Sequence, residues 1–472
     1  MKSNPMNVRF FSGVGSLIAL LLASFLNHDT AYGQTPVAEG HSHYHSHDSI
    51  VSHKLLFPSK TPDRIIANLT ADPAHSFAVN WRTDQQIATG YVEIAEATDG
   101  PGFLLSGIRH VKAVSERFEN QNSREPLVKA VFHSAVVSGL QPNTTYVYRV
   151  GDGSKALGTW SEWFQTTTAS DTADEPFSFI YFGDAQNSVK SMWSRVIRNS
   201  YRQFPDVDFM LHAGDLINDR DANVEWGEWF YAGSFIHATI PSIMTPGNHE
   251  YRDGVLSSLW KPQFTLPENG PTTAVKETCY AIDYQNLKMI SLDAVAFDEY
   301  EESREVQVKW LDSILRNNTK KWTAITLHYP IFSTAKGRDN KVLRETLKPL
   351  LDTYKVDLVL QGHDHTYSRG FAENEGKGLT VVNDVGTMYA VSVSGPKMYE
   401  SKDQDWMVRR GEFTQLFQII TVSEDTITYG AYTPIGTLYD AFELVKKNGK
   451  RQLINKVPDS PVRLRKDFIK EE

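Results

Sequence analysis

The sequence predicts a layered α/β domain, in which β-sheets form a sandwich core flanked by helices, preceded by a small all-β sandwich. Two observations support this fold class. From about residue 62 to residue 168, apolar and polar residues alternate as they do in half-buried strands. After a linker at 166–175 that is rich in Thr, Ala and Asp, short apolar strands alternate with segments of helical periodicity.

The N-terminal residues have the composition of an export signal. Lys2 and Arg9 precede an apolar run from Phe10 to Leu26, and a small-residue cleavage site precedes Gln34. This pattern is typical of a cleaved signal peptide over residues 1–33, and it favours a secreted, periplasmic or extracellular location. A retained membrane anchor is the alternative. The apolar run is short, however, and no other segment is apolar enough to span a bilayer once the signal is removed.

Residues 34–61 form a polar segment that contains the histidine tract from His41 to His47. Histidines on a flexible chain can bind metal ions but offer them no fixed geometry. We therefore interpret this segment as a linker and not as part of a catalytic site.

Composition limits the partners of the chain. The 472 residues carry a formal net charge of -9, and Lys and Arg form no stripe interleaved with aromatic residues. We therefore expect no nucleic-acid-binding surface. Cys279 is the only cysteine, so an intrachain disulfide is excluded, and we expect this residue to be a buried apolar side chain.

The all-β module is assigned to residues 62–170. Its strands are clearest at 77–81 and 146–150, where apolar and polar residues alternate. The segment 140–146 resembles the corner that precedes a late strand in fibronectin type III modules, and Trp81 is expected in the core. We interpret this module as a scaffold.

The α/β domain is assigned to residues 175–445. Its expected strands are 177–182, 209–213, 287–292, 323–327 and 356–360, and apolar residues at helical spacing lie between the later ones, at 310–315 and 343–351. The remaining segment, 446–472, is charged and is expected to be a frayed tail.

Five polar motifs each follow an apolar stretch of this domain. In chain order they are Gly183-Asp184-Ala185-Gln186, Gly214-Asp215, Gly247-Asn248-His249-Glu250, His328-Tyr329-Pro330 and Gly362-His363-Asp364-His365. Because α/β folds bind ligands in the loops at the carboxyl ends of strands, we expect these side chains to converge. Each motif alone is common, but five in sequence that carry Asp, Asn or His predict a metal-dependent enzyme site.

This series resembles the calcineurin-like metallophosphoesterases, whose motifs run Asp-x-His or Asp-x-Gly, Gly-Asp, Gly-Asn-His-Asp/Glu, His and Gly-His-x-His. The preceding sandwich and the motif at 362–369 resemble the purple acid phosphatase branch in particular. The resemblance covers about residues 62–441. It implies a pair of metal ions held by Asp184, Asp215, Asn248, His328, His363 and His365.

The resemblance also implies a role for each of these residues. Asp215 would bridge the two metals, because one anionic ligand between two cations offsets their repulsion. Asp184 and His365 would hold the first metal, and the other three residues the second. His249 has the position of the catalytic residue that contacts the substrate phosphate and assists the leaving group, and a histidine titrates in the right range to donate a proton.

Two positions depart from the family pattern. Purple acid phosphatases have a tyrosine three residues after the bridging Asp, where this chain has Asn218. Other members have a histidine two residues after the first Asp, where this chain has Gln186. Either Gln186 coordinates through its amide oxygen or it hydrogen-bonds to a ligand. We expect no tyrosinate-to-iron colour, and iron, manganese and zinc all remain candidates for the two metals.

Other residues near the motifs receive weaker assignments. We expect His212 to be a buried packing residue, and Asp364, Tyr367 and Arg369 to support the ligands or to face the substrate. Aromatic residues in the loops 226–235 and 251–266 either stack on a nucleoside or pack in the interior, and packing is our expectation.

The sequence thus predicts an exported two-metal enzyme that hydrolyses small-molecule phosphate monoesters through attack of a metal-activated hydroxide. Hydrolysis of diesters or nucleotides at the same site is one alternative. A non-catalytic surface protein that binds phosphate or metal is another, and the missing ligand of the first metal is its support. The six intact ligand positions and His249 favour catalysis.

Overall fold

The computed structural model describes residues 53–105, 107–120, 122, 124–155, 158–372 and 378–468. The predicted export signal and the histidine tract lie outside these residues. Within them, no helix combines the length and the apolar character that a membrane crossing requires.

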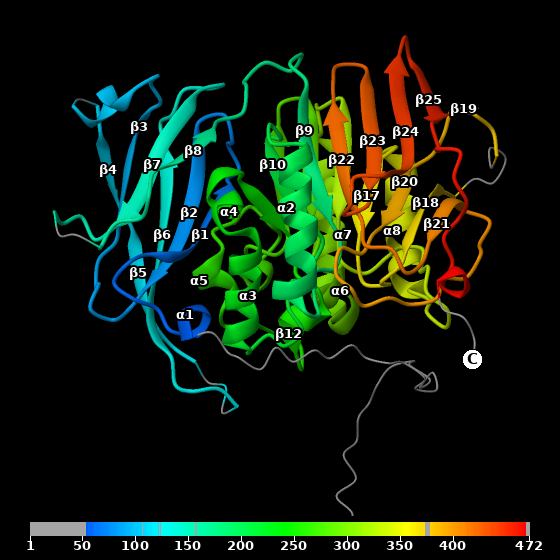
Figure 1. Cartoon of the computed structure of the whole chain (residues 1–472). Coiled ribbons are helices and arrows are strands. Elements are labelled where there is room, and N and C mark those ends of the chain that lie inside the picture. The colour runs from blue at the N-terminus through cyan, green and yellow to red at the C-terminus, as the bar shows by residue number, and fades with distance from the viewer. Residues whose placement is uncertain are drawn as a thin grey trace, which may run out of the picture. The chain divides into compact units, whose positions relative to one another are not determined.

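The N-terminal module is a sandwich of two sheets (Figure 1). One sheet contains β1 (Asp63–Leu69), β2 (Ser76–Thr83), β6 (Lys129–Ser138) and β5 (Val114–Glu119). The other contains β4 (Arg109–Lys112), β3 (Tyr91–Glu96), β7 (Thr145–Gly151) and β8 (Phe164–Thr167). The alternating side chains of these strands meet in a core that includes Trp81 and Tyr148, so the expected place of Trp81 is confirmed.

This module is continuous with the α/β domain. Strand β1 pairs with β2 on one side and, in parallel, with β11 (Ser242–Met244) on the other, where Asn68 is the partner of Ser242. In the described part of the chain, twelve strands therefore form one main sheet, in the order β19-β25-β24-β23-β22-β9-β10-β11-β1-β2-β6-β5. The sequence predicted two successive modules but not that they share a sheet.

The α/β domain is built on two sheets. Its part of the main sheet adds β9 (Phe177–Phe182), β10 (Phe209–His212), β19 (Val381–Asn383), β22 (Phe417–Val422), β23 (Thr426–Tyr432), β24 (Leu438–Lys447) and β25 (Lys450–Asn455). The second sheet, in the order β14-β15-β16-β17-β20-β18-β21, contains β14 (Tyr280–Tyr284), β15 (Leu287–Ser291), β16 (Trp322–Thr326), β17 (Leu358–Gln361), β20 (Met388–Val391), β18 (Tyr367–Phe371) and β21 (Met407–Gly411). A short hairpin pairs β12 (Tyr251–Arg252) with β13 (Val255–Leu256).

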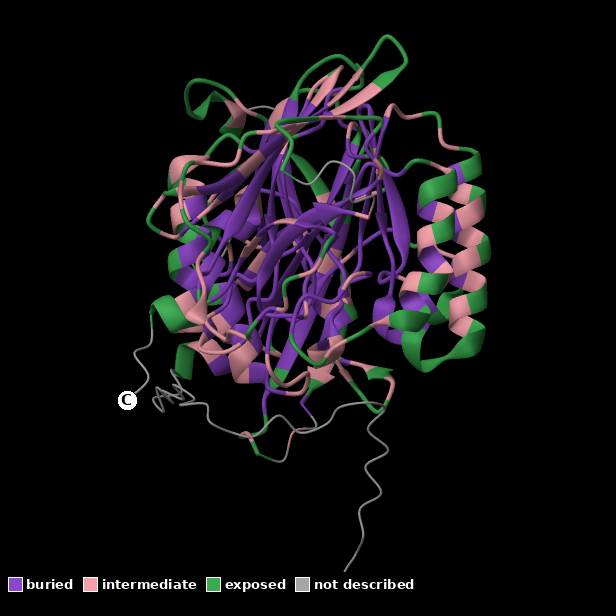
Figure 2. Cartoon of the chain, turned by 90° about the vertical axis from the view of Figure 1, so that its right-hand side faces the viewer, coloured by how far each residue is buried: buried purple, intermediate pink, exposed green. Residues whose placement is uncertain are grey.

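Adjacent residues in the second sheet face different cores. Met289 and Leu358 belong to the core that the two sheets share, whereas their neighbours Ile290 and Val359 belong to the core beneath the helices. Because side chains of a strand alternate between faces, this division shows that both faces of the sheet are covered. Figure 2 shows the result as strands that are buried almost throughout.

Helices cover the outer faces of both sheets. The helices are α1 (His53–Leu56), α2 (Ser194–Gln203), α3 (Asn223–Gly233), α4 (Phe235–Thr239), α5 (Trp260–Gln263), α6 (Ala294–Glu299), α7 (Glu301–Arg316) and α8 (Lys341–Thr353). On α8, Leu343, Leu347 and Leu351 are buried at intervals of one helical turn, as the sequence predicted. Each such leucine contributes roughly 2 kcal/mol by leaving water. Helices α6 to α8 pack on the second sheet, and α2 and α3 on the main sheet.

The C-terminal segment corrects the expectation of a frayed tail from residue 446. Strand β25 pairs with β24 and with β19, and it carries the fully buried Leu453. Asn455 accepts a 2.7 Å hydrogen bond from the buried Arg369. Lys450 is exposed, but Arg451, which lies on the same face as Leu453, donates to the carbonyls of Val356 and Gly386. Charged composition therefore did not reveal that this strand is packed.

Candidate metal centre

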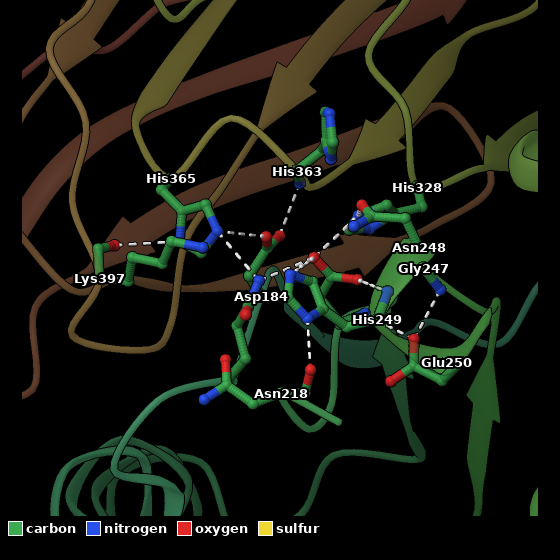
Figure 3. A network of polar contacts seen from close by, with 12 residues as sticks. Asp184, Asn218, Gly247, Asn248, His249, Glu250, His328, His363, His365 and Lys397 are labelled. Atoms are coloured by element: carbon green, nitrogen blue, oxygen red, sulfur yellow. Dashed lines mark hydrogen bonds and ion pairs between the residues drawn. The ribbon is translucent and has the colours of Figure 1, made fainter. Parts of the chain in front are cut away.

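The six predicted ligands come from loops at the carboxyl ends of five parallel strands. Asp184 follows β9, Asp215 follows β10, and Asn248 follows β11 in the main sheet; His328 follows β16, and His363 and His365 follow β17 in the second sheet. The two sheets face each other, so the same ends of both converge on one place. Figure 3 shows the side chains of Asp184, His328 and His365 close together there.

The described residues form two groups of potential metal ligands that share one carboxylate. Asp184, Asp215 and His365 make one group, and Asp215, His328 and His363 make the other. In each group the ligand atoms all lie within 4.8 Å of one another. Asn248, which belongs to neither group, has Oδ1 3.3 Å from His328 Nε2. Apart from Asn248, the two groups contain the residues that the resemblance implies, and Asp215 belongs to both.

Buried carboxylates and imidazoles face each other across the centre. Asp184 Oδ2 lies 3.2 Å from His365 Nε2, and Asp215 Oδ2 lies 3.2 Å from His328 Nε2. Asp184 Oδ2 and Gln186 Oε1 are buried and have no hydrogen-bond partner among the described residues. Buried oxygen atoms that lack a donor fit a bound cation. A mixed set of carboxylate, imidazole and amide ligands suits iron, zinc or manganese.

The charges of the site support the same conclusion. Burial alone lowers the pKa of His328, but Asp215 outweighs it and raises that pKa to about 9. Burial raises the pKa of Asp184 to about 7. Burial also acts to raise the pKa of Asp215, yet His328 and His249 hold it below its ordinary value. Two carboxylates buried together require positive charge beside them, which a protonated imidazole or a metal ion supplies.

Three of the predicted ligands adopt a backbone conformation that is unusual for residues with a side chain. Their φ angles are 52° for Asp215, 74° for His363 and 46° for His365. Such left-handed residues cost free energy and persist where the surrounding structure requires them, which is most often at functional sites. These turns place His363 in one ligand group, His365 in the other and Asp215 in both.

Two glycines of the motifs allow the loops to approach. A side chain at Gly247 would place its Cβ 2.2 Å from Asp215 Oδ1, and one at Gly362 would place it 2.3 Å from Asp184 Oδ1. Both distances are far inside van der Waals contact. The glycines of these motifs are therefore explained by the space that the two carboxylates occupy.

Hydrogen bonds from behind orient the two buried imidazoles. His328 Nδ1 lies 2.8 Å from the carbonyl oxygen of Ala213, and His365 Nδ1 lies 3.1 Å from that of Lys397. A carbonyl accepts a hydrogen bond, so each Nδ1 carries the proton and each Nε2 is left to face the centre as a ligand. Burial, and after it the charge of Lys397, lowers the pKa of His365 and favours this neutral form.

Glu250 is a structural residue that the sequence reasoning did not assign. Its buried carboxylate accepts hydrogen bonds from the backbone N–H groups of Asp215 at 2.9 Å, Leu216 at 2.8 Å and Gly247 at 2.7 Å. It thereby joins the loop of the shared carboxylate to the loop of Asn248. The sequence could have indicated this residue, because Glu250 directly follows His249 in the motif.

Gln186 lies inside the centre, whereas Asn218 borders it. Gln186 Nε2 donates to Asp215 Oδ2 at 2.8 Å and lies 3.0 Å from His365 Nε2. The amide therefore contacts both the shared carboxylate and a ligand of the first group, which supports its role as a hydrogen-bonding partner. The carbonyl oxygen of Asn218 accepts from His249 Nδ1 at 2.5 Å.

His249 stands beside the centre and outside both ligand groups. Its Nε2 lies 4.0 Å from Asp215 Oδ2, and 27% of its side chain is exposed. The backbone N–H of His249 donates to Asp215 Oδ1 at 2.9 Å. The imidazole is thus held in place on its Nδ1 side and is open to solvent, as a group that meets a substrate would be.

The weaker assignments separate into two kinds. Asp364 supports the centre, because its buried carboxylate accepts from the N–H groups of Thr334 and Ala335 and pairs with Arg338 at 3.2 Å. Tyr367 and Arg369 instead point away from the ligands and bind the buried Asp440, at 2.7 Å for Tyr367. They face neither the ligands nor a substrate, so they hold β18 to β24.

The remaining buried residues fit the packing interpretation. His212 is buried and stacks on Phe182, and Cys279 is fully buried. Trp226, Trp229 and Trp260 are also fully buried, so these aromatic rings of the two loops pack in the interior and are not available to a nucleoside.

Two family models match the chain on either side of its internal linker. The N-terminal domain of purple acid phosphatases matches residues 62–168, and the calcineurin-like phosphoesterase domain matches residues 177–367. The chain belongs to the purple acid phosphatase-like branch of the calcineurin-like metallophosphoesterases. Members of this family use a dinuclear metal centre, and the ligand groups described above fit one.

Individual relatives of this chain are distant. Purple acid phosphatase 13 of Arabidopsis thaliana is 24% identical over 301 residues, which is 55% of this chain and 54% of the relative. Acid phosphatase type 7 of Mus musculus is 25% identical over 336 residues, 66% of this chain and 72% of the relative. The chain thus spans only about half the length of the plant relative.

A solved structure confirms the fold. The purple acid phosphatase from yellow lupin (Lupinus luteus) seeds superposes with a TM-score of 0.65 at 17% identity, over 82% of this chain and 75% of that one. At this identity the similarity concerns the fold alone.

Proposed function

We propose that this protein is an exported metal-dependent phosphatase that hydrolyses phosphate monoesters of small molecules. The observation that carries the proposal is the pair of ligand groups that share Asp215. Two metals bound in this way would clamp the phosphate oxygens and lower the pKa of a water molecule between them. The sequence of residues 1–33 supports export.

The residues of the chain have distinct tasks in this proposal. Asp184, Asp215, Asn248, His328, His363 and His365 hold the metals. The carbonyl of Asn218 fixes the proton on His249 Nδ1, so that a second proton on Nε2 is available to the leaving oxygen. Glu250 and Asp364 hold the loops in register. Gln186 orients the shared carboxylate through its amide hydrogen bond.

The proposal is tested by metal analysis and turnover of the purified full-length chain. The protein is stripped of metal, reloaded with Mn, Zn or Fe, and assayed against a panel of monoesters and diesters. We expect two metal ions per chain and faster turnover of the monoesters. Faster turnover of diesters would overturn the substrate assignment, and metal binding without hydrolysis of any ester would support a non-catalytic binding protein.

A further inference from the structure

A cavity of about 330 Å³ lies where the sandwich meets the α/β domain, beside which α3 and α4 pack against β1 (Figure 1). We call it the junction cavity. Residues of β1, β2, α1, α3 and α4 line it, and none of the six predicted metal ligands does. Its walls include four aromatic residues, Phe164, Phe230, Tyr231 and Phe235, and the last two are about half exposed. The volume falls within the range of small-molecule sites.

Arg64 is the buried cation of this cavity. The pairing register of β1 with β2 shifts at this residue, and its φ angle is 50°, so a bulge redirects its side chain. Nη1 donates to Gln263 Oε1 at 3.0 Å, and Nη2 donates to the carbonyls of Asn223 at 2.8 Å and Leu55 at 3.2 Å. Nε is buried and has no hydrogen-bond partner among the described residues. Every acceptor that Arg64 meets is therefore neutral.

The positive charge of Arg64 is not compensated by a carboxylate in the part of the chain that the structure describes. Asp63 instead pairs with the buried Arg82 at 2.7 Å, and Glu125 accepts from the first N–H groups of α3. Burial, and after it the charge of Arg82, lowers the pKa of Arg64 well below its ordinary value. A buried cation without a counter-ion costs free energy unless a ligand supplies the negative charge.

The lining residues define the chemistry of a matching ligand. Arg64, Arg82 and Asp63 together leave one positive charge, and the exposed Lys54 and Glu162, which also line the cavity, cancel each other. The aromatic walls favour an apolar body beside that charge. The complement is therefore an anion of charge −1 that is attached to an apolar ring or chain.

We propose that the junction cavity binds a small organic monoanion, a carboxylate on an aromatic or aliphatic body, with the carboxylate at Arg64 and the body against Phe230 and Phe235. The Arg64 guanidinium lies 6.0 Å from the centre of the Phe230 ring, so one small molecule spans both contacts. A ligand bound there would contact β1 of the sandwich and helices of the α/β domain, and it would stabilise the folded chain. This site is independent of the proposed phosphatase function.

Calorimetric titration of the full-length, metal-loaded protein with three probes tests the proposal. 1-Naphthoate carries both the charge and the ring, 1-naphthalenemethanol carries the ring alone, and acetate carries the charge alone. We expect 1-naphthoate to bind at least about tenfold more tightly than either, because only it gains both the charged hydrogen bond and the apolar contact. Saturating orthophosphate in the metal centre should leave this affinity unchanged. Failure of 1-naphthoate to bind, equal affinity for the alcohol, or displacement by orthophosphate would each overturn the inference.

A variant locates the binding in the cavity. Phe235→Ala removes a half-exposed wall, so it should weaken 1-naphthoate binding about fivefold while the circular dichroism stays native. Phe468→Ala is the matched control, because Phe468 is also half exposed and packs on another ring but does not line the cavity. Unchanged affinity in the Phe235 variant, or an equal loss in both variants, would contradict the assignment.

The charge of Arg64 is tested in the same titration. Arg64→Met lowers stability, but the protein that remains folded should no longer distinguish 1-naphthoate from 1-naphthalenemethanol, because the anion has lost its partner. A preference for the anion that persists in this variant would show that Arg64 does not bind it. Where the variant does not fold, the three probes and Phe235→Ala on their own decide the proposal.

Discussion

Asp215 is the residue on which the centre depends most. Its two carboxylate oxygens accept from Gln186 and from the N–H of His249, and its own N–H donates to Glu250. It also belongs to both ligand groups. No other described residue is shared in this way, so its substitution should have effects that differ in kind from those at the other ligands.

We predict that Asp215→Asn weakens both metal sites together. The amide keeps the shape of the side chain but removes the negative charge that both cations would share, so each affinity should fall by at least about tenfold. Metal content after dialysis measures the effect. Asp219→Asn is the control, because Asp219 is partly exposed in the same loop and pairs with Arg252. Loss of a single metal from Asp215→Asn would show that Asp215 does not bridge.

His249→Ala should separate catalysis from metal binding. The imidazole lies outside both ligand groups, and its proposed role is to protonate the leaving oxygen. We expect kcat to fall by about a hundredfold or more while two metals stay bound. The fall should be smaller for a substrate with an acidic leaving group, which needs less protonation. If the variant loses metal, His249 is a ligand and the assignment is wrong.

Local motifs made most of these residues predictable from sequence. Asp184, Asp215, Asn248, His328, His363 and His365 each directly follow or lie close after a buried strand, so residue type and position sufficed. Lys397 gave no such signal, because it meets His365 only through the fold, across 32 positions of chain. A residue whose backbone carbonyl meets a ligand by tertiary contact alone cannot be recognised in one sequence.

The sequence predicted the helices that have periodic apolar residues, but it did not predict which strands pair with each other. Leu311 and Leu315 on α7 are buried one turn apart, as their spacing predicted. Strand β25 was not predicted because its buried Leu453 directly follows Lys, Arg and Gln in the sequence. The parallel pairing of β1 with β11 joins residues far apart in the chain, and alternation along a strand does not reveal its neighbour.

His133 on β6 gives the sandwich a predictable response to acid. Its ring stacks on Trp81 and bonds the hydroxyls of Thr83 and Ser115, both at 2.8 Å, and burial lowers its pKa to about 4. In the unfolded chain the histidine pKa is near 6.5, so between pH 6.5 and pH 4 the unfolded chain binds a proton at this position more readily than the folded protein does. His133 therefore makes the protein lose about 3 kcal/mol of unfolding free energy as the pH falls from about 6.5 to 4.

We expect His133→Gln to flatten this dependence. The amide cannot titrate, so the unfolding free energy of the variant should fall less than that of the native protein between pH 6.5 and pH 4, even if packing losses lower it at neutral pH. Urea unfolding across this range measures the difference. His75→Gln is the control, because His75 is half exposed and pairs only with Asp72. Identical slopes for both variants would contradict a buried neutral His133.

At the scale of the molecule, the sandwich and the α/β domain are joined by a shared sheet and by buried hydrogen bonds. The main sheet runs through both, and Glu125 of the sandwich region accepts from the first N–H groups of α3, at Asn223 and Val224, each at 3.0 Å. Buried Arg64 extends the connection by donating to Gln263 at 3.0 Å and to the carbonyl of Asn223 at 2.8 Å. The composition of the linker at 166–175 reveals the boundary of the sandwich, but the sequence does not reveal these contacts across that boundary.

Arg64→Met should therefore destabilise both parts together. The substitution leaves the oxygens of Gln263 and Asn223 buried without a donor, which costs about 3 kcal/mol. Hydrogen exchange followed through denaturant should show β2 in the sandwich and β16 in the α/β domain unfolding at one common, lowered midpoint. Arg117→Met, at an exposed position on β5, should leave that midpoint nearly unchanged. If β2 unfolds earlier in the Arg64 variant while β16 keeps its native midpoint, the two parts fold independently and the shared sheet does not couple them.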